Sequence, residues 1–148
     1  MTASAQYVFA SVVLPDRNTI LLVRLASDQS GWNLPSATVA VGETIQQAAR
    51  RAVLEATGVA VALTNLVGIY SAVLAAAPTS VHFVFSASTT PGRVRPGAHV
   101  ALEWLLLDEI DGLSDDQLAD APMLRRIVAD VRRGTRFPLG VLIEPGDV

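Results

Sequence analysis

The sequence contains neither cysteine nor lysine, and each absence narrows the chemistry open to the chain. Without cysteine there is no disulfide, no thiolate nucleophile and no zinc–thiolate site. The 11 positive charges are all arginine, and 14 acidic residues give a formal net charge of -3. This balance supplies no basic surface for nucleic acid, so we expect no nucleic-acid partner. Arginine in place of lysine fits phosphate recognition, but a compositional bias of the genome explains it more simply.

The sequence also has no apolar run long enough to cross a bilayer. The first apolar run, residues 7–14, is far shorter than the roughly 20 residues of a transmembrane helix. It lacks the basic segment that opens a signal peptide, so we read it as a strand. We therefore expect no membrane partner and a cytoplasmic location. Hydrophobic residues make up 51% of the chain, which excludes a disordered protein because such chains are poor in apolar residues.

Apolar runs separated by turn residues predict several strands. Residues 6–14 and 20–25 flank a Pro-Asp-Arg-Asn turn cluster and predict a hairpin of buried strands. Residues 91–97, rich in proline and glycine, predict a loop. The remaining strands are expected at residues 59–63, 67–73, 81–88, 102–107 and 137–143.

Residues 44–57 have the apolar spacing and the end signals of a helix. Their small and branched apolar side chains recur at offsets of three and four, which places them on one helical face. Thr44 and Gln47 form a capping box, in which each side chain bonds a free backbone amide of the first turn. Gly58 is suited to the left-handed conformation that closes many helices.

A second helix is expected at residues 114–133, with Ser114 as its cap. Pro122 interrupts the beginning of this segment, so a start at Ala121 is the alternative. Strands interleaved with two helices predict an α/β fold in which helices cover a sheet. The chain shows neither a repeat nor a linker, so we expect one domain over residues 1–148.

The first helix and the loop before it carry a motif with fixed spacing. A Gly-Glu-Thr step occupies residues 42–44. The motif positions that follow it at the required spacing are Arg51, Val53, Glu55, Gly58 and Val59. Upstream and downstream segments also match, at residues 21–24, 31–35, 103–105 and 107–110. Because these features run in order over residues 6–132, the chain resembles the Nudix hydrolase superfamily, which includes MutT-like proteins.

The resemblance implies a fold, a reaction and a cofactor. The fold would be a Nudix-like α/β/α sandwich with a mixed sheet flanked by helices. The reaction would be hydrolysis of a pyrophosphate bond in a nucleoside diphosphate derivative, with Mg²⁺ or Mn²⁺ as the cofactor. The partner would be a small nucleotide derivative, and a homodimer is a reasonable default for such a protein.

The motif departs from the family pattern where the metal ligands should be. Alanine occupies the opening glycine position at residue 37 and two glutamate positions at residues 52 and 56. Glu55 is the one remaining glutamate of the three on the helix. Carboxylates at these helix positions would converge on one patch and hold a hard cation. We therefore expect weak hydrolysis, with a catalytically inactive nucleotide-binding or regulatory module as the alternative.

The candidate site residues each have a functional and a structural interpretation. Glu55 is a candidate metal ligand and catalytic residue, or the ion-pair partner of Arg51 four residues earlier. Glu43 is a candidate metal ligand, or a carboxylate that complements the helix dipole. Arg51 is a candidate catalytic residue that meets substrate phosphates. Arg24 and Trp32 are candidate substrate-binding residues, through phosphate contact and base stacking, or ordinary surface and core residues.

Some residues outside the helix have less defined roles. Arg93 and Arg95 lie on a loop that could fold over a ligand. His99 could act as a base near neutral pH, but an ordinary loop histidine is the simpler interpretation, and His82 is expected to be a half-buried sheet residue. If the protein is an enzyme, carboxylates such as Glu103 or Asp108 would have to complete the metal shell.

Overall fold

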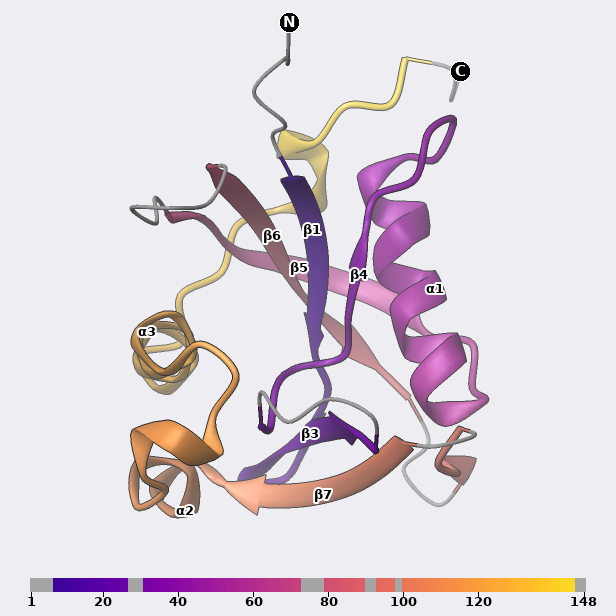
Figure 1. Ribbon diagram of the computed structural model, residues 1–148. Helices are drawn as coiled ribbons and strands as arrows, with labels where there is room; N and C mark the ends of the chain where they lie inside the picture. Colours follow the sequence, from indigo (N-terminus) through magenta and orange to yellow (C-terminus); the bar gives the residue numbers. More distant parts are fainter. Residues whose placement is uncertain (1–6, 27–30, 73–78, 90–92, 98–99, 146–148) are drawn as a thin grey trace, which may run out of the picture.

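The structure is a computed structural model that describes residues 7–26, 31–72, 79–89, 93–97 and 100–145. It contains two sheets (Figure 1). The four-stranded sheet has the order β4 (Ser36–Thr38), β1 (Tyr7–Val13), β6 (Ser80–Ser88) and β5 (Ala62–Ala72). In it β1 and β6 run parallel and the other pairs are antiparallel, so the sheet is mixed. The three-stranded antiparallel sheet has the order β2 (Pro15–Asp16), β3 (Thr19–Leu25) and β7 (Val100–Leu106).

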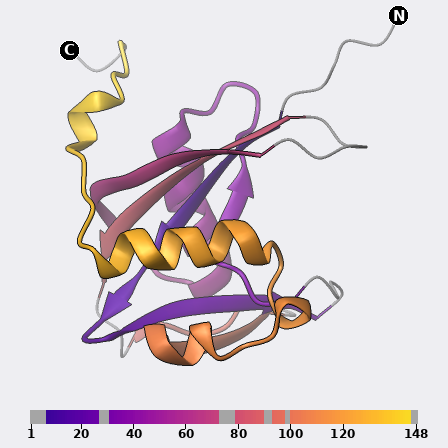
Figure 2. The same cartoon turned by 90° about the vertical axis from the view of Figure 1, so that its left-hand side faces the viewer.

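Helices lie on both sides of the four-stranded sheet. Figure 1 shows α1 (Ile45–Thr57) on one side and α3 (Ala121–Arg132) on the other. In Figure 2, α3 crosses in front of the sheets, with β3 below it. The short elements α2 (Leu107–Asp111), η2 (Asp115–Gln117) and η3 (Leu139–Val141) complete the fold. The expected α/β/α sandwich with a mixed sheet flanked by helices is confirmed.

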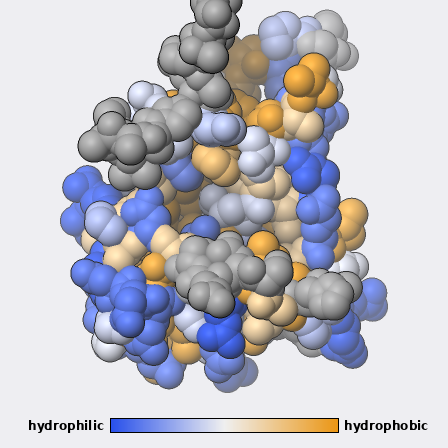
Figure 3. All heavy atoms as spheres, in the orientation of Figure 1, coloured by the Kyte–Doolittle hydropathy of each residue, from blue (hydrophilic) through white to orange (hydrophobic). Residues whose placement is uncertain are grey.

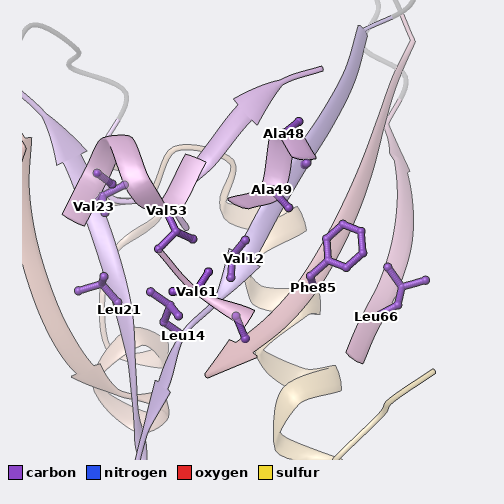
Figure 4. Close-up of a cluster of buried hydrophobic side chains, with 13 residues drawn as sticks. Val12, Leu14, Leu21, Val23, Ala48, Ala49, Val53, Val61, Leu66 and Phe85 are labelled. Carbon is purple, nitrogen blue, oxygen red and sulfur yellow. The ribbon is translucent and has the colours of Figure 1, made fainter. Parts of the chain in front are cut away.

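Two hydrophobic clusters follow from the alternation of side chains along the strands. Val12 and Leu14 point into a cluster beneath α1, whereas Val13 points into a cluster beneath α3. Figure 4 shows the first cluster drawn from both sheets and from α1, with Val53 and Phe85 among its members. The second half of β1, from Ala10 to Val13, is buried on both faces, so its residues do not alternate between apolar and polar as in a half-exposed strand, and Ser11 is the one polar residue among them.

The expected hairpin of residues 6–14 and 20–25 is wrong in its pairing. Both strands exist as β1 and β3, but β1 pairs with β4 and β6 while β3 pairs with β2 and β7. The turn residues themselves form the hairpin, with Asp16 opposite Thr19 and Arg17 at a φ of 59°. The chain therefore changes sheets at Leu14, immediately before this tight turn.

The other strand expectations have mixed outcomes. The two strands expected at residues 59–63 and 67–73 are one strand, β5, whose pairing with β6 shifts register twice. The strands at 81–88 and 102–107 are confirmed as β6 and β7, although Leu107 begins the unexpected α2. The prediction of a strand at residues 137–143 is wrong. Phe137 makes one bridge to Leu66, and η3 follows it after a proline.

Both helices begin where their capping signals allow. The capping box of Thr44 and Gln47 is present, and Gly58 closes α1 at a φ of 74°. The longer form of the second helix is wrong and its alternative start is confirmed, since α3 begins at Ala121. Pro122 lies in the first turn of α3, which is the helical position that tolerates the missing N–H.

Among the described residues, no helix is both long and apolar enough to cross a membrane.

Candidate active site

Arg51 on α1 joins the helix to the loop that precedes it. Its Nε donates to Glu43 Oε2 at 2.8 Å, and its Nη2 donates to Glu43 Oε1 at 3.0 Å. The same Nη2 donates to the carbonyl of Thr38 at 2.9 Å. Its Nη1 donates to Glu55 Oε1 at 3.2 Å, the pair that helical spacing had predicted. One guanidinium therefore fixes the positions of two candidate metal-binding carboxylates.

Glu43 is held as a carboxylate by this network. The hydrogen bonds from Arg51, with a further one from the N–H of Ala40 at 3.0 Å, lower the pKa of Glu43 to about 2. The two carboxylates in turn raise the pKa of Arg51 above its usual range. Both oxygens of Glu43 already accept hydrogen bonds, so the structure gives this residue a positioning role toward Arg51. Its role as a metal ligand stays a prediction.

Glu55 lies at a cavity of about 370 Å³ between α1 and β3, which we call the central cavity. Its side chain is 64% exposed, and Ala52 and Ala56 line the same cavity on the same helix. Val23 from β3 and Val100 from β7 form part of the opposite wall. The helix spacing of residues 52, 55 and 56 thus does direct three side chains to one patch, and one of the three is acidic.

The carboxylates around the central cavity are too few for a resident metal ion. In the part of the chain that the structure describes, no three His, Cys, Asp or Glu side chains gather as a metal site. Neither Glu103 nor Asp108 lines this cavity. Glu103 is exposed on β7 opposite Leu22, and Asp108 pairs with Arg132 at 3.1 Å. The donor set fits only an ion that substrate phosphates already hold, since Mg²⁺ commonly binds through one or two carboxylates plus phosphates.

A second cavity, of about 340 Å³, lies between α3 and the four-stranded sheet, and we call it the Phe–His cavity. Figure 3 shows the surface hollowed between α3 and β4, where this cavity opens. Phe9 stacks on His82 with ring centroids 4.7 Å apart and an interplanar angle of 12°. Burial lowers the pKa of His82, and the negative charge of Asp120 offsets only part of this effect, so the imidazole is neutral near pH 7. Both rings and Asp120 line the cavity.

Sequence reasoning missed the Phe–His cavity for a topological reason. Phe9 and His82 are directly opposite each other in the parallel pairing of β1 and β6. No local pattern specifies which strands become neighbours, so neither ring stands out alone. The polar residues of the cavity offered a better signal, because Asn33 belongs to the Trp-Asn-Leu-Pro segment that the family resemblance singled out.

The two candidate substrate-binding residues, Arg24 and Trp32, contact each other, which the sequence did not predict, and Glu55 is not part of the cavity that they line. The Arg24 guanidinium lies 4.7 Å from the ring centroid of Trp32. Both line a third cavity of about 420 Å³, which we call the Arg–Trp cavity. Leu25 and Gly31 line it together with the central cavity, so the two adjoin. Contact with a substrate stays a prediction for both residues.

The loop after β6 packs on the end of α1. The N–H of Arg95 donates to the carbonyl of Thr57 at 3.0 Å, and the N–H of Gly97 donates to the carbonyl of Ala56 at 2.9 Å. The loop thereby satisfies carbonyls that a helix end otherwise leaves without partners. Arg93 is exposed at the start of this loop, and His99 lies outside the described residues. The prediction that the two arginines fold over a ligand is untested.

Comparisons with known proteins agree with this architecture. The sequence profile of the NUDIX domain matches residues 5–127. A NUDIX hydrolase from Nitrosomonas europaea shares 26% identity at a TM-score of 0.81, covering 97% of this chain and 100% of that one. The MutT protein from Methanosarcina mazei Go1 shares 18% identity at a TM-score of 0.74, covering 90% and 98%. A UDP-X diphosphatase shares 17% identity at a TM-score of 0.71, covering 93% and 68%.

No curated protein matches the sequence. The profile match covers most of the chain and includes the whole of α1 with its Glu43–Arg51–Glu55 network. Nudix proteins act on small nucleotide derivatives, and Nudix hydrolases generally use divalent metal ions. On the profile match and the shared fold, this chain belongs to the NUDIX family.

Proposed function

We propose that the chain binds a nucleoside diphosphate derivative and slowly hydrolyses its pyrophosphate bond. The observation that carries the proposal is the junction of two cavities. Asn33, Leu34 and Ser36 line both the Phe–His cavity and the central cavity. A base beside the stacked rings can therefore direct its phosphates toward Glu55. The UDP-X diphosphatase of the same fold acts, by its name, on a nucleoside diphosphate joined to a second group.

Glu55 would help to hold a divalent metal ion that the substrate phosphates already bind. A diphosphate would supply most oxygen ligands of Mg²⁺ or Mn²⁺, and Glu55 would add one carboxylate at the cavity wall. The ion supplies Lewis-acid stabilisation of the charge that develops on the phosphates. Ala52 and Ala56 offer no charge at the two neighbouring positions. We therefore expect a rate about a hundredfold or more below that of a chain with all three carboxylates.

The test is turnover of a substrate panel by the wild type and two variants. The panel comprises nucleoside triphosphates, ADP-ribose, sugar nucleotides and dinucleotides, each with Mg²⁺, with Mn²⁺ and with excess chelator. We expect slow metal-dependent turnover, its loss in Glu55→Gln, and a large gain in the double variant Ala52→Glu/Ala56→Glu. Turnover that survives both the chelator and Glu55→Gln would contradict the proposal.

A binding module without turnover is the second candidate. It is favoured by the low exposure of Ala52 and Ala56, 4% and 8%, and by the packing of Ala56 in the hydrophobic cluster beneath α1. Alanine is also the strongest helix former, so these substitutions stabilise α1. Thermal stabilisation by nucleotides, with no product from any member of the panel, would establish this candidate over the first.

A further inference from the structure

The central cavity has a neighbour on each side. It shares Asn33, Leu34 and Ser36 with the Phe–His cavity, and it shares Leu25 and Gly31 with the Arg–Trp cavity. Residues 31–36 thus border all three cavities, with the Glu55 side chain at the middle one. A nucleotide that fills the first two cavities leaves the third one free.

Each flanking cavity offers a flat surface suited to an aromatic ring. In the Phe–His cavity this surface is the stacked pair of Phe9 and His82, 4.7 Å between ring centroids. In the Arg–Trp cavity it is the guanidinium of Arg24, which lies 4.7 Å from the ring centroid of Trp32. Arg24 is an exposed residue and lines this cavity, so its guanidinium is accessible to a ligand. Arginine planes and aromatic rings both bind nucleobases by stacking, whatever the base.

The three cavities are similar in size and each suits one part of a ligand. Their volumes are about 340, 370 and 420 Å³, near the lower end of the roughly 300–1,000 Å³ range of ligand pockets. One such cavity holds a nucleoside or a diphosphate rather than a whole substrate. In order, the cavities suit an aromatic ring of the ligand, its phosphates and a second aromatic ring.

We infer that the substrate is a dinucleotide, with its diphosphate in the central cavity and a ring in each flanking cavity. This inference rests on the proposed function and adds the identity of the second group. In hydrolysis a water oxygen bonds to one phosphorus while the bond from that phosphorus to the bridging oxygen breaks. The bridging oxygen leaves on the other phosphate, two mononucleotides form, and the two protons of the water pass to solvent.

The experiment compares the affinity of a dinucleotide with that of a mononucleotide under excess chelator, where no turnover occurs. The probes are diadenosine diphosphate and ADP, which carry the same base and a diphosphate, measured by titration calorimetry. The variants are Arg24→Ala and, as the matched control, Arg50→Ala, an exposed arginine on α1 that lines none of the three cavities. Thermal unfolding checks that each variant is folded.

The wild type is expected to bind diadenosine diphosphate about tenfold more tightly than ADP, a difference typical of one added stacking contact. Arg24→Ala lowers this affinity ratio to near one, and Arg50→Ala leaves it as in the wild type. A second readout uses Trp104→Phe, which leaves Trp32 as the one remaining tryptophan of the two in the sequence. In that variant the dinucleotide changes the emission of Trp32, and ADP does not.

The outcomes separate this inference from the proposed function. Equal affinity for both probes in the wild type, or an affinity ratio that Arg24→Ala leaves unchanged, overturns the dinucleotide inference while nucleotide binding stands. The absence of binding by every nucleotide in the panel overturns both.

Discussion

At the scale of single residues, the candidate site depends on Arg51 more than on any one carboxylate. Its guanidinium bonds Glu43, Glu55 and the carbonyl of Thr38, and so connects α1 with the loop that leads into it. Among the described residues, Arg51 alone bonds the Glu55 carboxylate, so this pair sets where the one acidic group of the central cavity lies. A surface pair of this kind contributes little to stability, and its main effect here is to hold the Glu55 carboxylate in place.

The pair of Glu43 and Arg51 makes stability depend on acid pH. The pKa of Glu43 is about 2 in the folded chain, against 4.5 for the free side chain. A depressed pKa contributes stability that is fully present above pH 4.5 and is lost as the pH falls toward 2. We expect the unfolding temperature of the wild type to fall more steeply over this range than that of Glu43→Gln. If the unfolding temperatures of the two proteins fall in parallel between about pH 5 and pH 2, the ion pair does not form in the native protein.

Asp130 on α3 is the buried charge whose loss should cost most. It is 7% exposed and accepts from the hydroxyl of Tyr70 at 2.7 Å and from the guanidinium groups of Arg126 and Arg133. Burial opposes its ionisation, but these hydrogen bonds outweigh it and lower the pKa of Asp130. Asp130→Ala is expected to reduce the free energy of unfolding by about 1–3 kcal/mol, because it leaves the half-buried hydroxyl of Tyr70 without its acceptor.

Urea denaturation measures the effect of Asp130→Ala, and a second aspartate provides its control. Asp115 pairs with Arg125 at 2.9 Å, but its side chain is 81% exposed. Asp115→Ala should therefore cost less than about 1 kcal/mol. Equal losses for the two variants would show that burial does not govern the contribution of Asp130.

The sequence predicted those site contacts that lie within one element, and few of the others. The pair of Arg51 and Glu55 follows directly from helical spacing, and the structure confirms it. Arg24 and Trp32 were both suggested for the substrate, although their contact with each other was not foreseen. The stack of Phe9 on His82 depends on which strand becomes the neighbour of β1, and local patterns carry no such information.

At the scale of elements the same distinction separates the correct predictions from the wrong ones. The boundaries of α1 were predicted because Thr44, Gln47 and Gly58 act on backbone groups within one turn. The partners of β1 and β3 were not, since pairing is decided by burial across the whole molecule. The five-residue α2 was missed because an element so short shows no apolar period.

The loop that packs on the end of α1 provides an element-scale prediction. A Cβ added to Gly97 would clash with the carbonyl oxygen of Glu55, which belongs to the backbone and cannot move aside easily. Gly97→Ala should force the loop away and break its bonds to the carbonyls of Ala56 and Thr57. We expect a loss of about 1–3 kcal/mol in the free energy of unfolding.

The control for Gly97→Ala is a glycine with open space around it. Gly140 lies in η3, and a Cβ there meets nothing within 4 Å. Urea denaturation of Gly140→Ala should therefore give a midpoint close to that of the wild type. A Gly97→Ala protein as stable as the Gly140→Ala protein would mean that the loop does not depend on this close approach.

At the scale of the whole molecule, residues 31–36 connect the two sheets. Asn33 bonds Val23 of β3 in both directions, at 2.7 and 2.9 Å. The carbonyl of Pro35 accepts from the N–H of Val12 on β1 at 3.0 Å. The same segment lines all three cavities, so a nucleotide bound as proposed would contact the segment that joins the two sheets. The single domain, the homodimer and the cytoplasmic location stay predictions.

Ligand binding at this junction should stabilise the whole fold. A nucleotide at 100 times its dissociation constant contributes about 2.7 kcal/mol, which for a chain of this size raises the unfolding temperature by about 5–10 °C. We expect this shift with ADP under chelator, and a larger one with Mg²⁺ because the ion joins the phosphates to Glu55. Glu55→Gln should remove the Mg²⁺-dependent increment and keep the shift under chelator. If the additional Mg²⁺-dependent rise persists in Glu55→Gln, the Glu55 carboxylate does not bind the ion, and the nucleotide alone would hold it.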